Sequence, residues 1–216
     1  MKISTICTAI VLAGAGIVQA QDTASRQKLD LPKPNCLVMS KGLPENGTLV
    51  MEVNVGEVRV VRSDELKTIR LTIEPHGFYD DATVQSWIKR FGVAGDRASI
   101  DLKLPKNEDN HQGASVTVSV PAQTDLKLEL GVGDLSVKGI EGNKELHVGI
   151  GDLTVGVTDS AKYNDIRTGT KIGDAEDAVS HQRSDGFFPK THHTSAQGMY
   201  KLHATVGIGD VNVVQD

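Results

Sequence analysis

The stretch Gly-Val-Gly-Asp-Leu-Ser-Val at residues 131–137 decides the fold of this 216-residue chain. Apolar residues fall on every second position over 126–132, and then at Leu135 and Val137. Strand side chains point to alternate faces with a period of two, so an odd step places the next apolar residue on the wrong face. A Gly-Asp pair absorbs such a step as a bulge or bend with a residue at positive φ. The stretch therefore predicts two strands joined by a bend.

The phrase recurs along the chain, and a more distant copy over 54–60 has Glu in place of Asp. The Gly-Asp pairs are Gly133-Asp134, Gly151-Asp152, Gly173-Asp174 and Gly209-Asp210. Their glycines are 18, 22 and 36 residues apart, and 36 is twice 18. A period near twenty with glycine bends is typical of stacked coils. We expect an all-β, mainly parallel β-solenoid. The alternative is an antiparallel β-sandwich in which Gly-Asp marks crossings between sheets.

The aspartates of these pairs have two interpretations. Carboxylates and loop carbonyls are the hard oxygen ligands that calcium prefers, but the calcium β-roll repeat is a tandem nonapeptide with a different glycine spacing. One copy also has Lys171 where glycine is expected, and Glu57 replaces one aspartate. We therefore predict that each aspartate caps its own bend by accepting backbone N–H groups, without a metal.

The first twenty residues have the pattern of a secretory signal. Lys2 precedes an apolar stretch over 3–18, and Val-Gln-Ala at 18–20 is a small-residue cleavage site. Residues 21–46 are polar, contain three prolines and lack a sustained period, so we expect a tether with short ordered pieces. Residues 47–216 form the β-strand-repeat domain. We expect a periplasmic or secreted protein.

Composition bears on the partners. The formal net charge is −5, with Lys and Arg scattered along the strands, so nucleic acid is not an expected partner. Nothing after the signal is apolar for long enough to cross a bilayer, so we expect no transmembrane segment in the mature chain. The mature chain has one cysteine, Cys36. We expect it to be partly buried, and an intermolecular disulfide is the alternative.

One segment has helical periodicity. Val84, Trp87, Ile88 and Phe91 have the spacing i, i+3, i+4, i+7, with Asp80 or Asp81 as N-cap and Gly92 as a stop. The pattern predicts a helix near Asp81–Phe91 whose apolar stripe closes one end of the core.

The segment 181–198 interrupts the repeat and is the candidate contact loop. Its candidate contact residues are Phe187, Phe188, His192 and His193, since loops on a rigid scaffold carry much of binding. The alternative is that the two phenylalanines fold back as a lid over Ile172 and Val179. A zinc site is not expected, because adjacent histidines on a strand point to opposite faces.

No catalytic motif stands out. The chain contains no Gly-x-Ser-x-Gly elbow, no His-Glu-x-x-His motif and no Walker loop. Carboxylates such as Asp125 and Glu129 lie at alternating solvent positions. A glycosidase with a distributed carboxylate pair stays open, because carboxylate separation is not visible in a sequence. We predict a protein without catalytic residues or cofactors.

Residues 115–137 read SVTVSVPAQTDLKLELGVGDLSV. They resemble the bacterial DUF4097 family of β-strand-repeat proteins, also called the putative adhesin family, whose members repeat the Gly-Asp-strand phrase. The resemblance extends from Gly47 to the C-terminus and is strongest over Ser115–Val155 and Val206–Val213. It implies an exported or envelope-associated stacked β domain, and no catalytic residues.

Three functions follow as hypotheses. The first is a non-catalytic envelope or secreted protein whose strand faces and loops bind or scaffold an unknown protein or glycan. The second is a metal- or glycan-binding module that uses residues 181–198. The third is a hydrolase with an unrecognised carboxylate pair.

Overall fold

The computed structural model describes residues 36–105 and 113–216. The predicted signal segment and most of the predicted tether lie outside the described residues. The described part contains sixteen strands, the short helix α1 (Asp81–Ser86) and the 3-10 turn η1 (Ser160–Lys162). The prediction of an all-β protein with one short helix is therefore confirmed. The first strand, β1 (Leu37–Gly42), is an ordered piece within the segment expected to be a tether.

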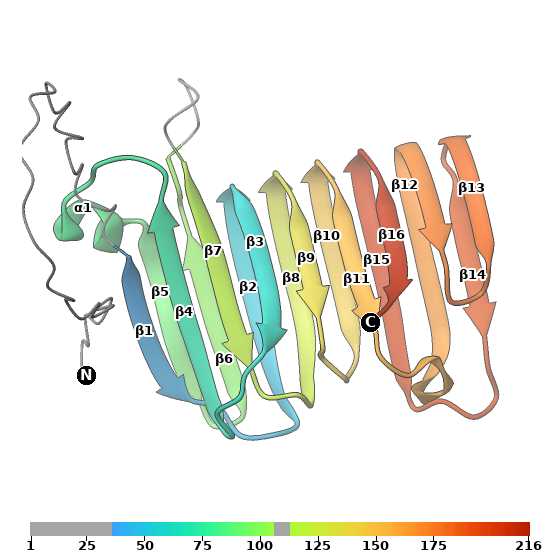
Figure 1. Ribbon diagram of the computed structural model, residues 1–216, viewed down its shortest axis with the longest axis horizontal. Helices are drawn as coiled ribbons and strands as arrows, with labels where there is room; N and C mark the ends of the chain where they lie inside the picture. The colour runs from blue at the N-terminus through green and yellow to red at the C-terminus, as the bar shows by residue number, and fades with distance from the viewer. Residues whose placement is uncertain (1–35, 106–112) are drawn as a thin grey trace, which may run out of the picture.

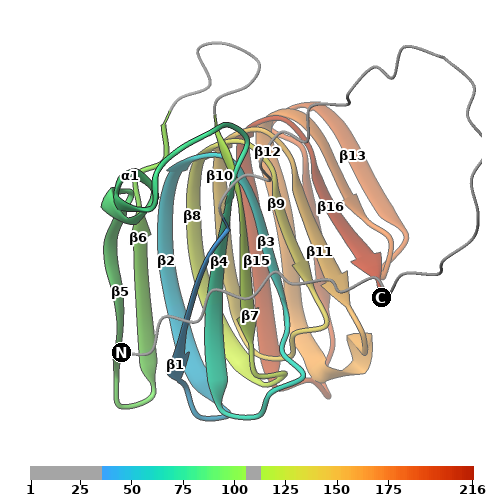
Figure 2. The same ribbon diagram turned by 60° about the vertical axis from the view of Figure 1, so that its left-hand side comes forward.

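The sheet folds back on itself into two facing layers, so that it resembles a flattened, nearly closed barrel (Figures 1 and 2). β12 (Tyr163–Asp177) belongs to both layers, because its first half pairs with β15 and its second half with β16. In Figure 1 the rear layer continues from β12 through β15 (Tyr200–Ile208), β10 (Lys144–Ile150), β8 (Thr124–Val132), β2 (Gly47–Val55), β6 (Arg97–Leu102) and β5 (Ile88–Ala94). The front layer continues through β16 (Val211–Gln215), β11 (Leu153–Val157), β9 (Leu135–Lys138), β3 (Glu57–Arg62), β7 (Ala114–Val120), β4 (Thr68–Pro75) and β1.

The core fills the space between the layers. Along β8 the side chains of Leu126, Leu128 and Leu130 are buried while those of Lys127 and Glu129 are exposed, as a strand with one solvated face requires. Burial resumes at Leu135, five residues after Leu130. The predicted odd step at the Gly-Asp pair is confirmed, because the chain crosses there from the rear layer to the front layer.

Five crossings of this kind line one edge of the molecule, which we call the bend edge. Their glycines all have positive φ: Gly56, Gly133, Gly151, Gly173 and Gly209. Gly151 shows why glycine is needed. Its φ is +126°, and an added Cβ would overlap the carbonyl oxygen of Gly133 in the neighbouring bend. Any other residue would strain the backbone and push two coils apart.

The coils do not follow one another in chain order. A coil is a rear strand, its bend and the next front strand, and neighbouring coils pair in parallel. The last coil, β15–β16, lies between β10–β11 and β12. The sequence suggests that the 36-residue interval contains two periods of the stack. The strand order shows that it does not. It contains the hairpin of β13 (Gln182–Phe187) and β14 (Lys190–Thr194), which pairs antiparallel with the far side of β12.

The prediction of a parallel β-solenoid is thus not confirmed, although the central coils do pair in parallel. Parallel pairing between coils excludes the antiparallel sandwich for the central coils. Among the described strands, antiparallel pairs occur at the two ends of the stack, where β1, β4 and β5 lie on one side and β13 and β14 on the other. A strict solenoid, with coils added in sequence order, is not what the strand order gives.

The helix prediction is wrong in its length. Asp80 is the N-cap, and its carboxylate accepts a hydrogen bond from the N–H of Thr83 at 2.6 Å. The helix ends at Ser86, however, and Trp87 is its C-cap. Ile88 and Phe91 belong instead to β5, which pairs antiparallel with β6. The hydrogen bonds offered by β6 outweigh a helical periodicity of only two turns.

Candidate binding surface at the bend edge

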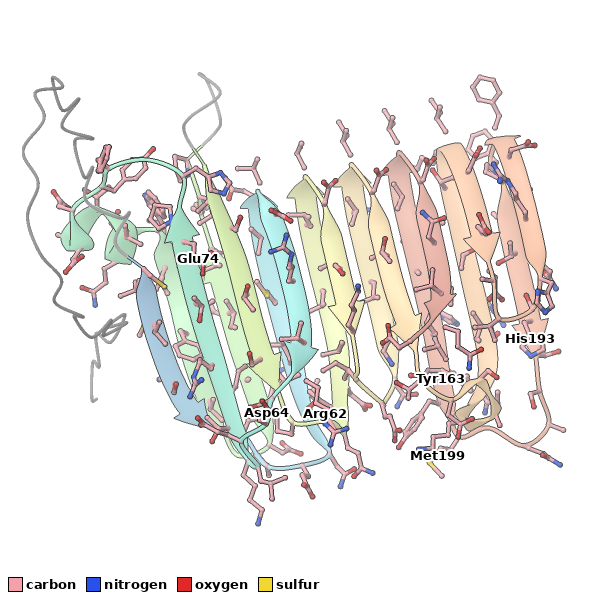
Figure 3. The ribbon with its side chains drawn as sticks, viewed as in Figure 1. Arg62, Asp64, Glu74, Tyr163, His193 and Met199 are labelled. Carbon is pink, nitrogen blue, oxygen red and sulfur yellow. The ribbon has the colours of Figure 1, made fainter. Side chains whose placement is uncertain are left out.

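Apolar side chains project from the bend edge at the ends of neighbouring strands, as Figure 3 shows along the upper ends of the strands. We call this row the apolar ladder; it consists of Val132, Ile150, Ile208, Ile172 and Phe187. The four aliphatic side chains are 45–50% exposed and Phe187 is 80% exposed. Contiguous exposed apolar surface is uncommon on soluble proteins and marks contact sites.

Strand register makes the ladder continuous. Val132 lies opposite Ile150, Ile150 opposite Ile208, and Ile208 opposite Ile172. Ile172 in turn lies opposite Phe187 of the hairpin strand β13. Hydrogen-bonded strands are about 4.8 Å apart. The ladder is therefore a straight row that crosses every coil from β8 to the hairpin.

The ladder is exposed because of its place in the strand. Val132 shares the inward phase of Leu130, and the sequence therefore predicts that it faces the core. The core, however, ends at Leu130 and resumes at Leu135, so Val132 lies beyond the last layer of packed side chains. The sequence did contain a signal for this. Three ladder residues are flanked by glycine on both sides, as in Gly149-Ile150-Gly151, and glycine offers no side chain to cover them.

A row of glycines runs beside the ladder on the outer face of the rear layer. Gly131, Gly149 and Gly207 occupy equivalent positions in β8, β10 and β15. A Cβ on any of them would overlap a carbonyl oxygen of the adjacent coil. These glycines let neighbouring backbones pack closely and leave the surface beside the ladder flat.

The aspartates of the Gly-Asp pairs form a second row, the aspartate ladder: Asp134, Asp152, Asp210 and Asp174. Each of the first three accepts, through Oδ1, a hydrogen bond from the backbone N–H of the next aspartate in the stack. The three distances are 3.3, 3.0 and 2.8 Å. The prediction that each aspartate caps its own bend is therefore wrong in its partner. Stacking brings the N–H of the adjacent bend within reach of the carboxylate.

The end of the aspartate ladder has a basic partner. Arg183 of β13 donates to Asp174 Oδ2 at 3.0 Å. Asp134, Asp152 and Asp210 have no ion pair among the residues that the structure describes. In the same part of the chain, no group of three His, Cys, Asp or Glu side chains has the arrangement of a metal site.

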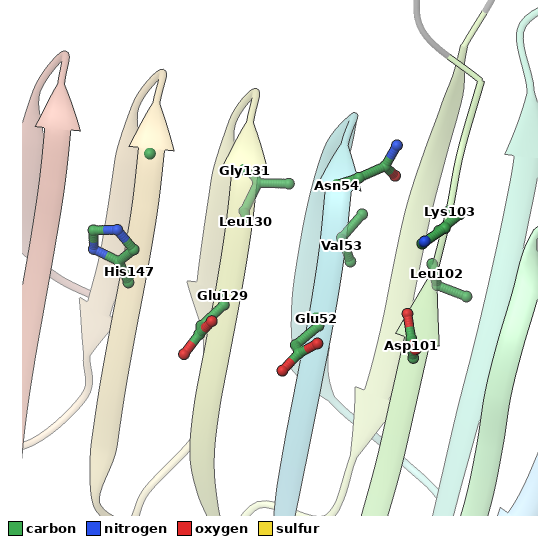
Figure 4. A pocket seen from close by; sticks show the side chains of 11 residues that line it. Glu52, Val53, Asn54, Asp101, Leu102, Lys103, Glu129, Leu130, Gly131 and His147 are labelled. Carbon is green, nitrogen blue, oxygen red and sulfur yellow. The ribbon is translucent and has the colours of Figure 1, made fainter.

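A shallow groove lies on the outer face of the rear layer, next to the glycine row (Figure 4). Its volume is about 310 Å³. Asp101, Glu52 and Glu129 line it side by side in register, and His147 follows Glu129. No ion pair links these three carboxylates to another described residue, whereas Lys127 pairs with Glu145 at 3.2 Å on the same face. Glu52 and Glu129 are exposed in the groove, and Asp101 is half-buried.

The predicted contact residues separate into two places. Phe187 and Phe188 are both exposed at the end of β13, so the lid over Ile172 and Val179 is wrong. Phe188 has a φ of +56°, and its N–H donates to the carbonyl of Lys171 at 3.0 Å. This turn holds both rings in solvent, and Phe187 becomes the last member of the apolar ladder.

His192 and His193 lie on β14, away from the ladder. His192 Nε2 lies 3.0 Å from Asp165 Oδ1, and His203 Nε2 lies 3.3 Å from Asp165 Oδ2. His193 is half-buried. Burial tends to raise the pKa of Asp165, but hydrogen bonds from Arg167, His203 and His192 outweigh it and lower that pKa. The four predicted residues therefore do not form one site.

Lys144 is the buried cation of the described chain, at the edge opposite the bends. Its amine donates to the hydroxyl of Tyr163 and lies 4.7 Å from the centre of that ring. Burial lowers the pKa of Lys144 to about 7, against the opposing influence of Glu141, Asp125 and Asp216. An amine with such a pKa can act as a nucleophile. Lys144 is buried, however, and it does not line the groove on the outer face of the rear layer.

Comparison with known proteins supports the fold. The chain is similar to the crystal structure of a "putative cell adhesion protein" from Clostridium sporogenes, with 13% identity and a TM-score of 0.52. The match covers 84% of this chain and 100% of that one. A "putative adhesin" from Bacteroides fragilis (11% identity, TM-score 0.28, 85% and 99% covered) and a "Putative lipid binding protein" from Parabacteroides distasonis (9% identity, TM-score 0.25, 83% and 96% covered) also match. These two TM-scores are too low to support an argument.

No protein-family model matches the chain, and no curated protein matches it. The similarity to the Clostridium protein shows a shared fold. Among the described residues, none of the helices is long and apolar enough to cross a membrane.

Proposed function

We propose that the chain is an exported, non-catalytic β protein of the bacterial cell envelope, of the adhesin-like DUF4097 type, and that the bend edge is its binding surface. The apolar ladder is the observation that carries this proposal. Five apolar side chains lie in register across the coils and face solvent, although the inward positions of the same strands are buried. Apolar surface gains free energy when a partner removes it from water.

The scaffold suits a binding role. Neighbouring bends are joined by backbone hydrogen bonds, such as Gly133 N–H to Ile150 C=O at 2.8 Å and Gly151 N–H to Ile208 C=O at 2.9 Å. These bonds fix the ladder before any partner arrives, so little conformational entropy is lost on binding. The cell-adhesion description of the Clostridium protein, and the signal-like first twenty residues, agree with a surface role outside the cytoplasm.

The candidate chemical groups support a non-catalytic function. Glu52 and Glu129 of the groove are exposed, Asp101 is half-buried, and Lys144 is buried in the core. His192 and His203 both face Asp165, which gives a charge cluster without a nearby nucleophile among its hydrogen-bonding partners.

Retention of cell-envelope fragments on beads coated with the exported chain tests this function. The double variant Ile150→Ser/Ile208→Ser should lose most of the retention, because it removes two central members of the ladder. Leu66→Ser is the matched control, since Leu66 is 76% exposed but lies in the loop between β3 and β4 at the opposite edge. Thermal unfolding of each variant checks that it is folded. Equal retention by the wild type and the double variant would overturn the proposal.

A further inference from the structure

The spacing of the apolar ladder selects the shape of its partner. Four intervals between strands separate Val132 from Phe187, which gives a row about 19 Å long at 4.8 Å per strand. Four turns of an α-helix cover about 22 Å. Same-face side chains of an extended strand repeat every 6.6 Å or more, so four repeats cover about 27 Å and drift by more than one coil. One apolar residue per helical turn therefore fits one apolar residue per strand of the row.

The backbone of the bend edge also excludes an added strand. The N–H groups of Gly56, Gly133, Gly151 and Gly209 all donate to carbonyls of adjacent coils, at 2.8–3.0 Å. An extended segment across the ladder would find these groups already bonded, so β-strand addition has no template here. A helix satisfies its own backbone hydrogen bonds and needs only side-chain contacts.

The charges beside the apolar ladder determine which sign of charge a partner should carry. Each aspartate of the aspartate ladder follows its apolar neighbour by two residues, as Asp152 follows Ile150. The carboxylates of Asp134, Asp152 and Asp210 lack an ion pair among the described residues. On the other side, beyond the flat glycine row, Glu129 lies at the β8 end with Glu52 on the adjacent β2, whereas β10 and β15 carry His147 and Thr205 at the equivalent positions. The flank formed by the aspartate ladder is therefore acidic along the central ladder, and the opposite flank is acidic only at its β8 end.

We propose that the bend edge binds an amphipathic α-helix of a partner protein, which lies across the coils with its apolar stripe on the apolar ladder and lysine or arginine side chains on the aspartate ladder. The inference rests on the proposed function and adds the chemistry of the partner. Phe187 is the aromatic anchor at one end of the row, and a helix of about 14 residues spans the whole row at 1.5 Å per residue.

The same charges disfavour two other occupants. A second copy that placed its bend edge against this one would bring two aspartate ladders together, and like charges in close register repel. An anionic lipid surface would meet the same acidic row. The chain's own helix α1 spans only Asp81–Ser86 and lies at the β1 end of the stack, away from the central ladder.

Binding of designed peptides tests the inference. The probe is a labelled peptide of about 18 residues with leucine once per helical turn and lysine on both flanks of that stripe. A second peptide has the same composition arranged with a period of two, and a third has glutamate in place of each lysine. Fluorescence anisotropy at low salt should show binding of the first peptide, binding at least roughly tenfold weaker for the second, and no binding of the third.

Variants of the protein locate the contact. Ile150→Ser/Ile208→Ser should weaken binding of the first peptide by roughly tenfold or more, and Leu66→Ser should leave it unchanged. Asp152→Asn/Asp210→Asn keeps the acceptor oxygen of each cap and removes its charge. This variant should weaken binding several-fold at low salt and reduce the salt dependence.

Several results would overturn the inference. The helical peptide could bind no better than the period-two peptide, or the lysine peptide no better than the glutamate peptide. No peptide could bind at all, or phosphatidylglycerol vesicles could bind in place of the peptides. If the peptides fail while envelope fragments still bind through the ladder, the proposed function stands and the helical partner is wrong. If the ladder variants change neither peptide binding nor the retention of envelope fragments, both the proposed function and the helical partner are wrong.

Discussion

At one end of strand β10 Lys144 is buried, and at the other end Ile150 is half-exposed, although both side chains have the same inward phase. Apolar side chains are usually buried and charged side chains exposed, and the two edges of the molecule depart from this rule in opposite directions. At the bend edge, apolar side chains lie in solvent. At the opposite edge, an amine that is only 2% exposed lies in the core.

The way in which the chain crosses between the layers explains the difference. At the bend edge, each coil crosses at a glycine, and a glycine bend has no side chain to place over its neighbours. At the opposite edge, longer connections such as residues 139–143 and the turn η1 bring the carbonyl of Gly142 and the ring of Tyr163 against Lys144. A tight bend exposes what lies beneath it, whereas a longer loop covers it.

The largest expected effect concerns the opposite edge and pH. The folded pKa of Lys144 is about 7, and the unfolded value is about 10.5. Between these values the unfolded chain binds more protons, so Lys144 makes stability rise with pH, by roughly 1.4 kcal/mol per pH unit. Below pH 7 both states are protonated and this contribution stays constant. Urea unfolding between pH 6 and 9.5 measures the slope.

The variant Lys144→Met should remove that slope, and Lys127→Met, at an exposed position, should leave it. A slope that persists in Lys144→Met would contradict the assignment. Above pH 10 a second group acts in the opposite sense. Burial raises the pKa of Tyr163, so the unfolded tyrosine loses its proton first and stability falls as pH rises further.

The next largest effect concerns the bends. Gly151→Ala should destabilise the protein by about 3 kcal/mol, because it combines a positive φ with overlap against the carbonyl of Gly133. Gly92→Ala in the end strand β5 is the control, since no atom lies within 4 Å of its added Cβ. It should change stability by less than about 0.5 kcal/mol. Similar losses in both variants would show that the bend carries no special strain.

A smaller effect separates the caps of the bend edge from a metal site. Asp152→Ala removes the acceptor of the N–H of Asp210 and should cost about 1 kcal/mol. Asp152→Asn keeps an acceptor oxygen and should cost less. Chelator should leave the melting temperature of the wild type unchanged. A fall of many degrees with chelator would favour calcium over capping.

The smallest effect tests the ladder itself. Ile150→Ser should change stability by less than about 0.5 kcal/mol, because half of this side chain is already in water. Leu146 lies on the same face of the same strand and is fully buried. Leu146→Ala should cost about 3 kcal/mol of folding free energy. Chemical denaturation of the two variants gives the comparison. An equal loss at Ile150 would mean that the ladder contributes to the fold and not to binding.

Much of the local structure could be predicted from the sequence. The odd step in the apolar alternation predicted a bend at Gly133, and Asp80, which is the N-cap of α1, was one of the two predicted N-cap residues. The exposed Phe187 was among the predicted contact residues. The rest of the candidate surface was not predicted, since Val132, Ile150 and Ile208 have the same phase as core residues. Alternation shows which way a side chain points, but not where along a strand the opposite layer stops covering it.

The sequence by itself determined that this protein is built of short strands joined by glycine bends, because side-chain alternation and the need for positive φ are local properties. Only the tertiary structure decided the order of the coils, with the last inserted before β12, and the end of helix α1 at Ser86. It also decided that Asp134, Asp152 and Asp210 each cap the adjacent bend, and that Lys144 is buried while the apolar ladder is not. These features depend on which strands become neighbours, and pairing between distant segments leaves no local pattern in the chain.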